Sequence, residues 1–266
     1  AWAQWKGEEI QEGYLVSGIL IPLIIPITLP LWMLALSVAF AVIFTKEIFG
    51  GTGMNTFNVA LGARAFLFFS YPASMTGDTI WTSTTQAFGF GYTLPDGFTM
   101  ATPLGEIAQG ADVNTSLNDM IIGLIPGSVG ETSVIAIAIG ALILIWTNIA
   151  SWKTMLSVFL GGAAMGWLFH STGASPLQWY EHIVLGGFCF GAIFMATDPV
   201  TSARTETGKW YFGFLVGAMA VIIRVLNPGY PEGMMLAILF GNMCAPLIDY
   251  CVVQSNINKR AKRAKN

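Results

Sequence analysis

The sequence predicts an all-α integral membrane protein, a bundle of about eight transmembrane helices in a single transmembrane domain that covers residues 1–266. Of these residues 54% are hydrophobic and only 10% are charged, whereas a soluble domain typically has roughly 25% charged residues. The apolar residues gather in segments that approach the length of a membrane span. Basic residues are unevenly spread, because none occurs between Arg64 and Lys153. Together these observations exclude an ordinary soluble domain.

Eight apolar segments follow one another along the chain, and a spanning helix needs about 20 residues. They are residues 14–30, 31–49, 57–71, 133–149, 152–170, 181–197, 210–226 and 232–253. The first contains Pro22, Pro26 and Pro30, which predict a kinked or broken helix. The third is short and contains Arg64, so we expect a half-span that is buried in protein instead of facing lipid.

The basic residues predict the orientation of these segments, since loops rich in Lys and Arg stay in the cytoplasm. The basic tail, residues 254–266, should therefore be cytoplasmic. Counting back one crossing at a time places Lys153, Arg204 and Lys46 on the same side. The loop 72–131, which has no basic residue, is then extracytoplasmic. A patch for lipid or nucleic acid is the alternative for the tail, but its place beside a span favours a topology anchor.

Residues 31–71 and 181–226 share one order: a span, a polar connection rich in Gly, Thr, Asn or Asp, and a second span. Inverted repeats in transporters place such paired helices around a site near the middle of the membrane. The letters of the two segments are only weakly alike, so the internal repeat is a hypothesis.

The connection Gly50–Asn58, GGTGMNTFN, is a candidate binding segment. Its glycines let the backbone approach a ligand closely. Asn55 and Asn58 are three residues apart, so they share a face if a helix begins there. Their amides could then pair with donors and acceptors on the edge of a flat polar ring. The alternative is a Gly-rich turn in which Asn55 caps the next helix.

Two acidic residues lie at or inside apolar segments. Asp198 precedes a proline, and it either caps a helix that begins there or binds a cation or the N–H of a cofactor. Asp249 lies within the last segment, near its cytoplasmic end. A carboxylate at the centre of a spanning helix costs roughly 2.5–3.5 kcal/mol. We therefore expect Asp249 to pair with Arg64 or Arg224, or to serve an ion path.

The extracytoplasmic loop offers hydroxyl groups at Thr99 and Thr102. A threonine hydroxyl is a poor nucleophile unless a base activates it, and no Ser-His-Asp arrangement is apparent nearby. Polarity alone therefore favours an exposed loop without catalytic chemistry of its own.

Several classes of site are excluded by their missing motifs. The three cysteines have neither CxxC nor metal-ligand spacing, so we expect small buried hydrophobic residues and no metal site. No P-loop, HExxH motif or nucleic-acid-binding module occurs.

The sequence resembles a known family in three stretches: GGFCFGAIFMATDPVTSARTETGKWYFG, IRVLNPGYPEGMMLAILFGNMCAPLID and KEIFGGTGMNTFN. It is the family of the B-type membrane subunit of the bacterial Na+-translocating NADH:quinone oxidoreductases (Na+-NQR), to which the D-type subunit of the Rnf complex is homologous. The resemblance implies two inverted repeats of five helices, similar to urea-transporter proteins. Members usually have about ten spans, so the eight seen here would begin at the third, and we expect further residues before Ala1.

The resemblance also implies a covalent flavin. In the family, a threonine of the outer loop carries FMN through a phosphoester bond, in a motif that often reads Ser-Gly-Ala-Thr, and a separate enzyme attaches it. The matching residues here are Thr99, Met100, Ala101 and Thr102. Thr102 is therefore the candidate for covalent FMN, and Thr99 is the second candidate.

A second flavin and an ion are implied as well. The residues that match the riboflavin site of the family are Asn55, Asn58, Thr197 and Asp198. Asp249 matches an acid associated with Na+, and it is our candidate for the ion path together with Asp198. Carboxylate oxygens suit a hard cation.

As a function, the resemblance implies a redox subunit of the Na+-transporting NADH:ubiquinone reductase in the bacterial inner membrane. It would pass electrons from FMN and riboflavin toward quinone, coupled to Na+ translocation. Its partners would be the other subunits, membrane lipid and quinone, with no nucleic acid. The alternatives are an Rnf-type subunit, with ferredoxin and NAD as electron partners, and a non-redox channel or transporter for a small polar solute.

Overall fold

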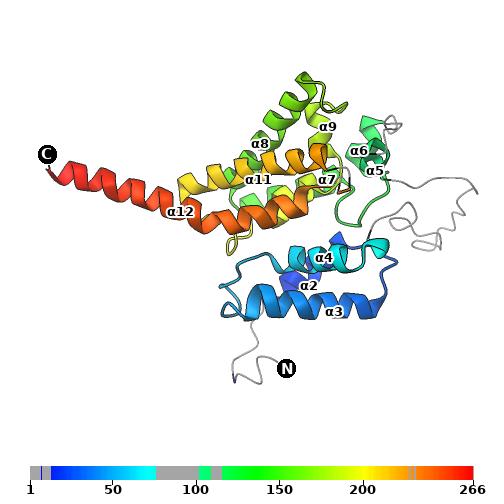
Figure 1. Cartoon of the computed structure of the whole chain (residues 1–266), viewed down its shortest axis with the longest axis horizontal. Coiled ribbons are helices and arrows are strands. Elements are labelled where there is room, and N and C mark those ends of the chain that lie inside the picture. The colour runs from blue at the N-terminus through cyan, green and yellow to red at the C-terminus, as the bar shows by residue number, and fades with distance from the viewer. Residues whose placement is uncertain are drawn as a thin grey trace, which may run out of the picture.

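The structure is a computed structural model that describes residues 7, 13–75, 102–108, 116–227, 229–230 and 232–265. Every regular element within these ranges is a helix, and the helices form two packed groups with the C-terminal helix projecting from one of them (Figure 1). The predicted all-α fold is confirmed for the part of the chain that is described.

The first group lies along one side of the molecule (Figure 1, blue to cyan). It contains α2 (Tyr14–Ile24), α3 (Leu31–Ala41) with its π-helical continuation η1 (Val42–Glu47), and α4 (Val59–Ser70) followed by the 3-10 turn η2 (Pro72–Ser74). α4 packs against both α2 and α3. α2 ends at Ile24 because Pro26 disfavours a helical residue before it. The break predicted in residues 14–30 is therefore confirmed.

The second group contains the remaining helices. They are α5 (Pro103–Ala108), α6 (Leu117–Ile122), α7 (Val134–Trp146), α8 (Trp152–Ser171), α9 (Trp179–Val184), α10 (Phe188–Phe190) with its π-helical continuation η4 (Gly191–Met195), α11 (Glu206–Leu226) and α12 (Met234–Lys265). The predicted segments 133–149, 152–170, 210–226 and 232–253 each correspond to one of them.

The predicted segment 181–197 is not one continuous helix. α9 ends at Val184 and α10 begins at Phe188, and Gly186 between them has a φ of +65°, which glycine adopts without strain. The guanidinium of Arg224 donates hydrogen bonds to the carbonyl oxygens of His182 and Leu185, at 2.6 and 3.2 Å. A charged side chain from α11 thus satisfies the backbone groups that the break leaves open.

α8 and α11 cross closely because glycines line their contact. A Cβ at Gly217 would collide with the carbonyl oxygen of Val158, and a Cβ at Gly161 would collide with that of Phe214. Small residues of this kind let two helices approach backbone to backbone in membrane proteins. The two helices are therefore closely packed within the second group.

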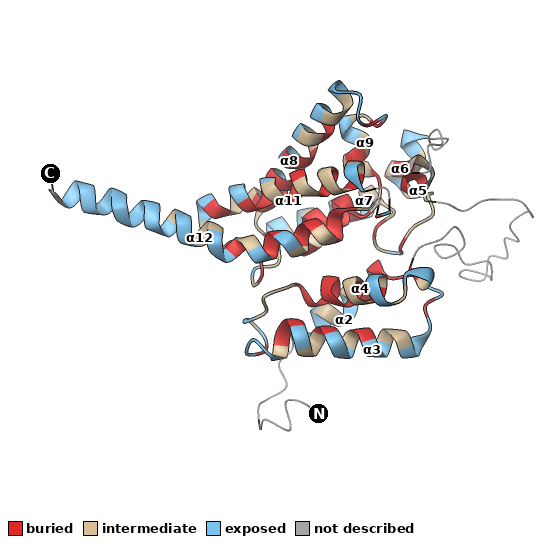
Figure 2. Ribbon diagram, viewed as in Figure 1, coloured by how far each residue is buried: buried red, intermediate tan, exposed pale blue. Residues whose placement is uncertain are grey.

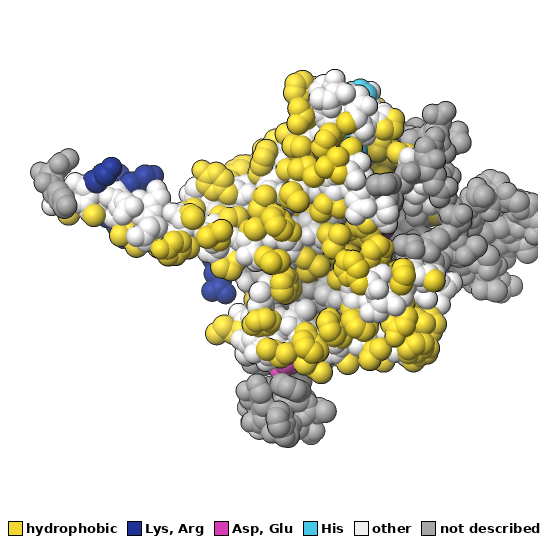
Figure 3. Space-filling view, viewed as in Figure 1, with side chains coloured by type: hydrophobic (Ala, Val, Ile, Leu, Met, Phe, Trp, Pro, Cys, Tyr) yellow, Lys and Arg dark blue, Asp and Glu magenta, His cyan; other side chains and the backbone are white. Residues whose placement is uncertain are grey.

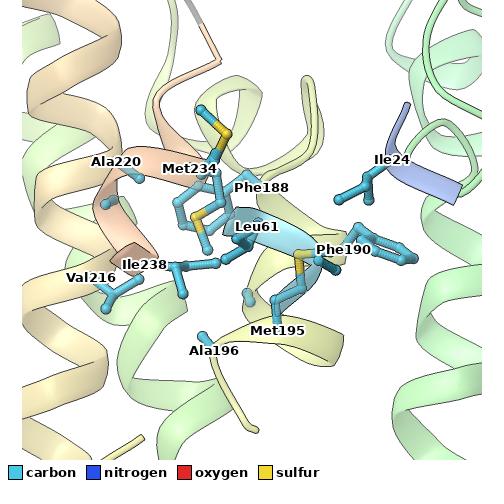
Figure 4. Close-up of a cluster of buried hydrophobic side chains, with 14 of the residues drawn as sticks. Ile24, Leu61, Phe188, Phe190, Met195, Ala196, Val216, Ala220, Met234 and Ile238 are labelled. Atoms are coloured by element: carbon cyan, nitrogen blue, oxygen red, sulfur yellow. The ribbon is translucent and has the colours of Figure 1, made fainter. Parts of the chain in front are cut away.

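The two groups share one hydrophobic core. Leu61 of α4, Phe188 of α10 and Ile238 of α12 are each less than 2% exposed, and Figure 4 shows their side chains meeting with that of Met234. The core thus joins segments that are far apart in the sequence.

Much of the exterior is apolar. Large hydrophobic side chains are exposed on many helices, such as Leu142 of α7 at 68% and Phe69 of α4 at 68%, and Figure 3 shows hydrophobic side chains spread widely over the described part of the visible face. α11 and the Met234–Ala264 part of α12 are long and apolar enough to cross a membrane, and three shorter apolar helices accompany them. These features are consistent with a membrane protein.

α12 unites the last predicted span with the predicted tail. Its first half is partly buried against α11, and its second half projects from the bundle with exposed side chains (Figure 2). Residues 254–265 are therefore a helical extension of the last apolar segment.

Candidate functional site

Asn58 begins α4. Its side-chain Oδ1 accepts hydrogen bonds from the backbone N–H groups of Ala60 and Leu61, at 3.0 and 3.3 Å, as an N-cap does. We expected Asn55 to be the cap if this connection were only a turn, and that was wrong. The helix begins at Val59, so Asn55 lies three residues too early to cap it.

Asn55 instead lines a cavity of about 350 Å³, which we call the Asn55 cavity. Its other walls are the 200–204 connection and the part of α12 from Asn242 to Asp249. The Asn55 Oδ1 atom is buried and has no hydrogen-bond partner in the described residues. Buried polar atoms are nearly always paired, so this unpaired acceptor in a residue that lines the cavity is a candidate partner for the donor of a bound group. The volume lies within the roughly 300–1,000 Å³ of small-molecule sites.

Asp198 shapes the opposite wall of this cavity. Its two carboxylate oxygens accept hydrogen bonds from the Val200 N–H and the Thr201 hydroxyl, both at 3.0 Å. These bonds close a turn, whereas α11 begins only at Glu206 and is capped by Thr205. The interpretation of Asp198 as the cap of a following helix was therefore wrong. Burial raises the pKa of Asp198 above its ordinary value, and the two hydrogen bonds oppose that rise.

Asn242 of α12 joins the two walls, and the sequence reasoning missed it. With its amide turned so that both groups are satisfied, its oxygen accepts from the Asn58 N–H at 3.2 Å and its nitrogen donates to the Thr201 carbonyl at 3.3 Å. The residue is only 2% exposed. The available signal was an amide side chain inside the apolar run LAILFGNMCAP, where a polar group must find a partner.

Asp249 also lines the Asn55 cavity. Its Oδ2 accepts from the Arg204 N–H at 2.8 Å, and its Oδ1 accepts from the Thr205 N–H and hydroxyl at 3.0 and 2.6 Å. The expected pairing of Asp249 with Arg64 or Arg224 was wrong. These three donors, which immediately precede α11, stabilise the carboxylate by hydrogen bonds, so Asp249 ties α12 to α11.

Thr197 takes a different position from its neighbours. Its hydroxyl donates to the Ile193 carbonyl oxygen at 2.5 Å, back along η4. The structure thus brings Asn55 and Asp249 to one cavity, with Asn58 and Asp198 bracing its walls, and Thr197 bonded elsewhere.

A second polar group is buried between the two helix groups. The Arg64 guanidinium forms ion pairs with Glu131, at 2.6 Å between Nη1 and Oε1, and with Glu232. The Ser128 hydroxyl donates to the other oxygen of Glu131 at 2.6 Å. We call Arg64, Ser128, Glu131 and Glu232 the Arg64 cluster. Arg64 is 4% exposed, which agrees with its predicted burial in protein.

Thr102 lies beside the Arg64 cluster. Its hydroxyl oxygen accepts a hydrogen bond from the Gly105 N–H at 3.2 Å, at the start of α5. Together with Glu131, Gly186 and Glu232 it lines a cavity of about 30 Å³. Thr99, the second candidate, lies outside the described residues.

The two sites are well separated along α12. Glu232 precedes the first residue of this helix and reaches the Arg64 cluster, whereas Asp249 reaches the Asn55 cavity. The helix between Met234 and Asp249 is roughly 22 Å long at about 1.5 Å per residue. The Thr102 region and the Asn55 cavity therefore lie toward opposite ends of the bundle.

Comparison with known proteins gives one family. Residues 1–258 match the model described as the NQR2, RnfD, RnfE family. Three relatives are each described as the B-type subunit of a Na(+)-translocating NADH-quinone reductase. Those of Stutzerimonas stutzeri (strain A1501) and Ectopseudomonas mendocina (strain ymp) are 50% and 49% identical over 98% of this chain. That of Chromohalobacter salexigens is 50% identical over 97%. The chain spans 65%, 65% and 62% of their respective lengths.

The Arg64 cluster makes a prediction about stability. Glu131→Gln leaves the buried guanidinium with one carboxylate fewer, and removing one partner of a buried ion pair typically costs about 3–5 kcal/mol. We expect a clearly lower melting temperature for the purified protein in detergent. Glu206→Gln is the control, because it removes an exposed carboxylate that also bonds two cations. Equal melting temperatures for both variants would show that the Arg64 cluster does not stabilise the fold.

Proposed function

Because the chain belongs to the NQR2, RnfD, RnfE family, we propose that it acts as a membrane redox subunit of a Na+-translocating NADH:quinone oxidoreductase. It would pass electrons toward quinone while the complex moves Na+ across the bacterial inner membrane. The observation that carries the proposal is the near-complete coverage of this chain by relatives of that name at about half identity. The other subunits, lipid and quinone would be its partners.

We further propose that the chain contributes eight spans arranged as inverted repeats, as in urea-transporter-like proteins. Two π-helices support the repeat. η1 precedes the Gly-rich connection to α4, and η4 precedes the Asp198 connection to α11. In each case a threonine hydroxyl donates back to a carbonyl four residues earlier, from Thr45 to Ala41 and from Thr197 to Ile193. The basic connections would lie in the cytoplasm with the 254–266 tail, and the 72–131 loop outside.

Covalent FMN on Thr102 is compatible with the local structure. The Thr102 oxygen accepts the bond from Gly105, and an ester oxygen keeps a lone pair for that bond. The adjoining cavity of about 30 Å³ is too small for a flavin ring, so the ring would lie outside it. When bound, FMN would supply the electron-carrying chemistry, while the residues of this chain fix its position.

Riboflavin in the Asn55 cavity is likewise compatible with the local structure. The unpaired Asn55 Oδ1 would accept a hydrogen bond from a ring N–H, which would satisfy it. Asn58, Asp198 and Asn242 would hold the two walls of the cavity in place. Thr197 would act only by shaping the end of η4.

Asp249, with Asp198, remains our proposal for the ion path. Both carboxylates lie on the side where the basic connections gather, and Asp249 borders the Asn55 cavity. The Thr201 hydroxyl bonds to Asp198, and carboxylate and hydroxyl oxygens are ligands that a hard cation prefers.

The family description also includes RnfD and RnfE, which keeps an Rnf-type role as the second candidate. Co-purification from native membranes decides between the two. A complex that oxidises NADH supports the first, and one that contains a ferredoxin-oxidising subunit supports the second.

The flavin attachment can be tested on a denaturing gel. We expect the fluorescent band of this chain under ultraviolet light to disappear in Thr102→Ala and to remain in Thr102→Ser, which keeps the hydroxyl. Loss of the α5 cap alone costs only about 1 kcal/mol, so the variant should still fold. A band that persists in Thr102→Ala and is lost in Thr99→Ala moves the site to Thr99. No flavin in any sample of the complex would favour a channel or transporter.

The Asn55 cavity can be tested by flavin extraction. Asn55→Ala should lose extractable riboflavin while the covalent band is unchanged, because Asn55 has no partner in the described residues whose loss would weaken the fold. Asn58→Ala is the contrasting variant. It should lower the melting temperature, since it removes a helix cap that contributes about 0.5–2 kcal/mol. Full riboflavin content in Asn55→Ala would contradict the assignment.

The ion path can be tested by the Na+ dependence of quinone reduction. Asp249→Asn keeps one acceptor for Thr205 and removes the charge, so we expect a higher Na+ concentration for half-maximal rate. Thr205→Val serves as the structural control, because it removes a hydroxyl bonded to Asp249 and leaves the carboxylate. If Asp249→Asn is less stable but its Na+ dependence is unchanged, the residue is only a tie between α12 and α11.

A further inference from the structure

We propose that a cavity between α8 and α11 binds the phosphate of an anionic phospholipid headgroup. The cavity measures about 400 Å³ and lies between the turn that joins α7 to α8, the 197–204 connection and the first turn of α11. Its charged lining residues are Lys153, Arg204, Glu206 and Lys209. We call it the Lys153 cavity. This inference goes beyond the proposed redox role.

The lining carries an excess of positive charge. Three cations face one carboxylate, and Glu206 already bonds two of them, with its Oε2 at 2.6 Å from the Lys153 Nζ and its Oε1 at 2.5 Å from the Lys209 Nζ. The exposed Arg204 guanidinium forms no ion pair in the described part of the chain, although its charge acts on nearby Asp249. Ammonium and guanidinium groups are the usual partners of phosphate. The lining itself thus has two more positive than negative charges, and Asp249 outside it offsets part of the charge of Arg204.

The cavity lies where apolar surface meets polar turns. Trp152 lines it and packs edge-on against Trp210, with ring centroids 6.1 Å apart. Next to it, Trp146 and Ile149 are 85% and 63% exposed. Tryptophan is enriched at the membrane–water interface, so these residues mark the level of the lipid headgroups.

The adjoining surface suits acyl chains. Along α7, Ile139 and Leu142 are 56% and 68% exposed, and they lead away from the cavity into the apolar exterior. A soluble phosphate would use the cations but would leave this surface bare. A phospholipid would occupy both, with its phosphate among the cations and its chains along α7.

Backbone groups add to the cations. α8 begins at the cavity, and the side chain of its N-cap residue, Ser151, makes no capping hydrogen bond. The first N–H groups of this helix are therefore open to an acceptor, and helix N-termini favour anions. Basic pockets between helices on the cytoplasmic side are known to bind anionic headgroups. The inference rests on the proposed membrane orientation and is independent of the flavins.

The test measures bound lipid by native mass spectrometry of the purified protein, titrated with phosphatidylglycerol or with phosphatidylcholine. We expect phosphatidylglycerol to bind more tightly. Lys209→Gln should weaken it about fivefold, the effect of one basic residue near an anionic surface. The substitution is made at Lys209 and not at Arg204, because Arg204 also borders the Asn55 cavity. Lys262→Gln, an exposed lysine at the end of α12, is the matched control and should leave the affinity unchanged.

A second variant distinguishes a specific effect on lipid binding from a loss of folding. Glu206→Gln frees both lysines and removes the carboxylate that competes with the phosphate, so it should tighten phosphatidylglycerol binding. A misfolded protein would not gain affinity. Equal weakening by Lys209→Gln and Lys262→Gln, or equal affinity for both lipids, would overturn the proposal. So would full displacement of the lipid by millimolar inorganic phosphate, which would identify a site for small anions. Riboflavin content, measured in parallel, reports on the proposed redox role separately.

Discussion

The fold depends on the neutralisation of one buried cation. Arg64 lies in the middle of α4 at 4% exposure, and an unpaired charge there would cost several kcal/mol. Its two carboxylates come from distant parts of the chain, Glu131 before α7 and Glu232 before α12. Gly187 makes room for Glu131, because a Cβ at that position would lie 2.6 Å from Oε1. The ion pairs thereby hold the first helix group against the second, and the Thr102 cavity forms at their edge.

The need to pair buried polar groups also determines the contacts in the rest of the polar interior. Backbone groups at membrane depth must be satisfied within the protein, and side chains from α11 and α12 do so where other helices break or begin. Arg224 donates hydrogen bonds to carbonyl groups at the break after α9. Asn242 joins the walls of the Asn55 cavity, and Asp249 accepts hydrogen bonds from N–H groups at the start of α11. The residues that could hold a ligand are thus also the residues that satisfy backbone hydrogen-bonding groups. Binding and stability share side chains in this molecule, which is why the Asn55 Oδ1 is notable as an acceptor that the fold leaves unpaired.

The sequence predicted the helical segments well and the partners of their polar residues poorly. Long apolar runs and the prolines at 22, 26 and 30 are local signals, and they were enough for the helices and for the break after Ile24. The break at Gly186 was missed because it depends on Arg224, some forty residues away. The partners of Asp249 were missed because they include backbone N–H groups, and an amino-acid sequence does not show which backbone groups a side chain will meet. The choice of Asn58 over Asn55 as a cap depended on where α4 begins, a boundary that two similar side chains cannot fix. The membership in a family was visible from motifs, whereas Asn242 required the packed structure.

The two π-helices make chain length, as well as side-chain identity, a determinant of the site. A π-turn closes its hydrogen bonds over one more residue than an α-turn, so η1 and η4 each hold one residue that an α-helix of equal length would not need. Deleting a single residue there would restore α geometry, and the helix on either side would keep its angular relation, because the wide turn had absorbed the extra residue. In η1 the wide turn includes the buried Lys46 and lies next to the glycine-rich connection. Each π-helix therefore lets the chain take up one more residue beside a binding wall without altering any residue that lines it.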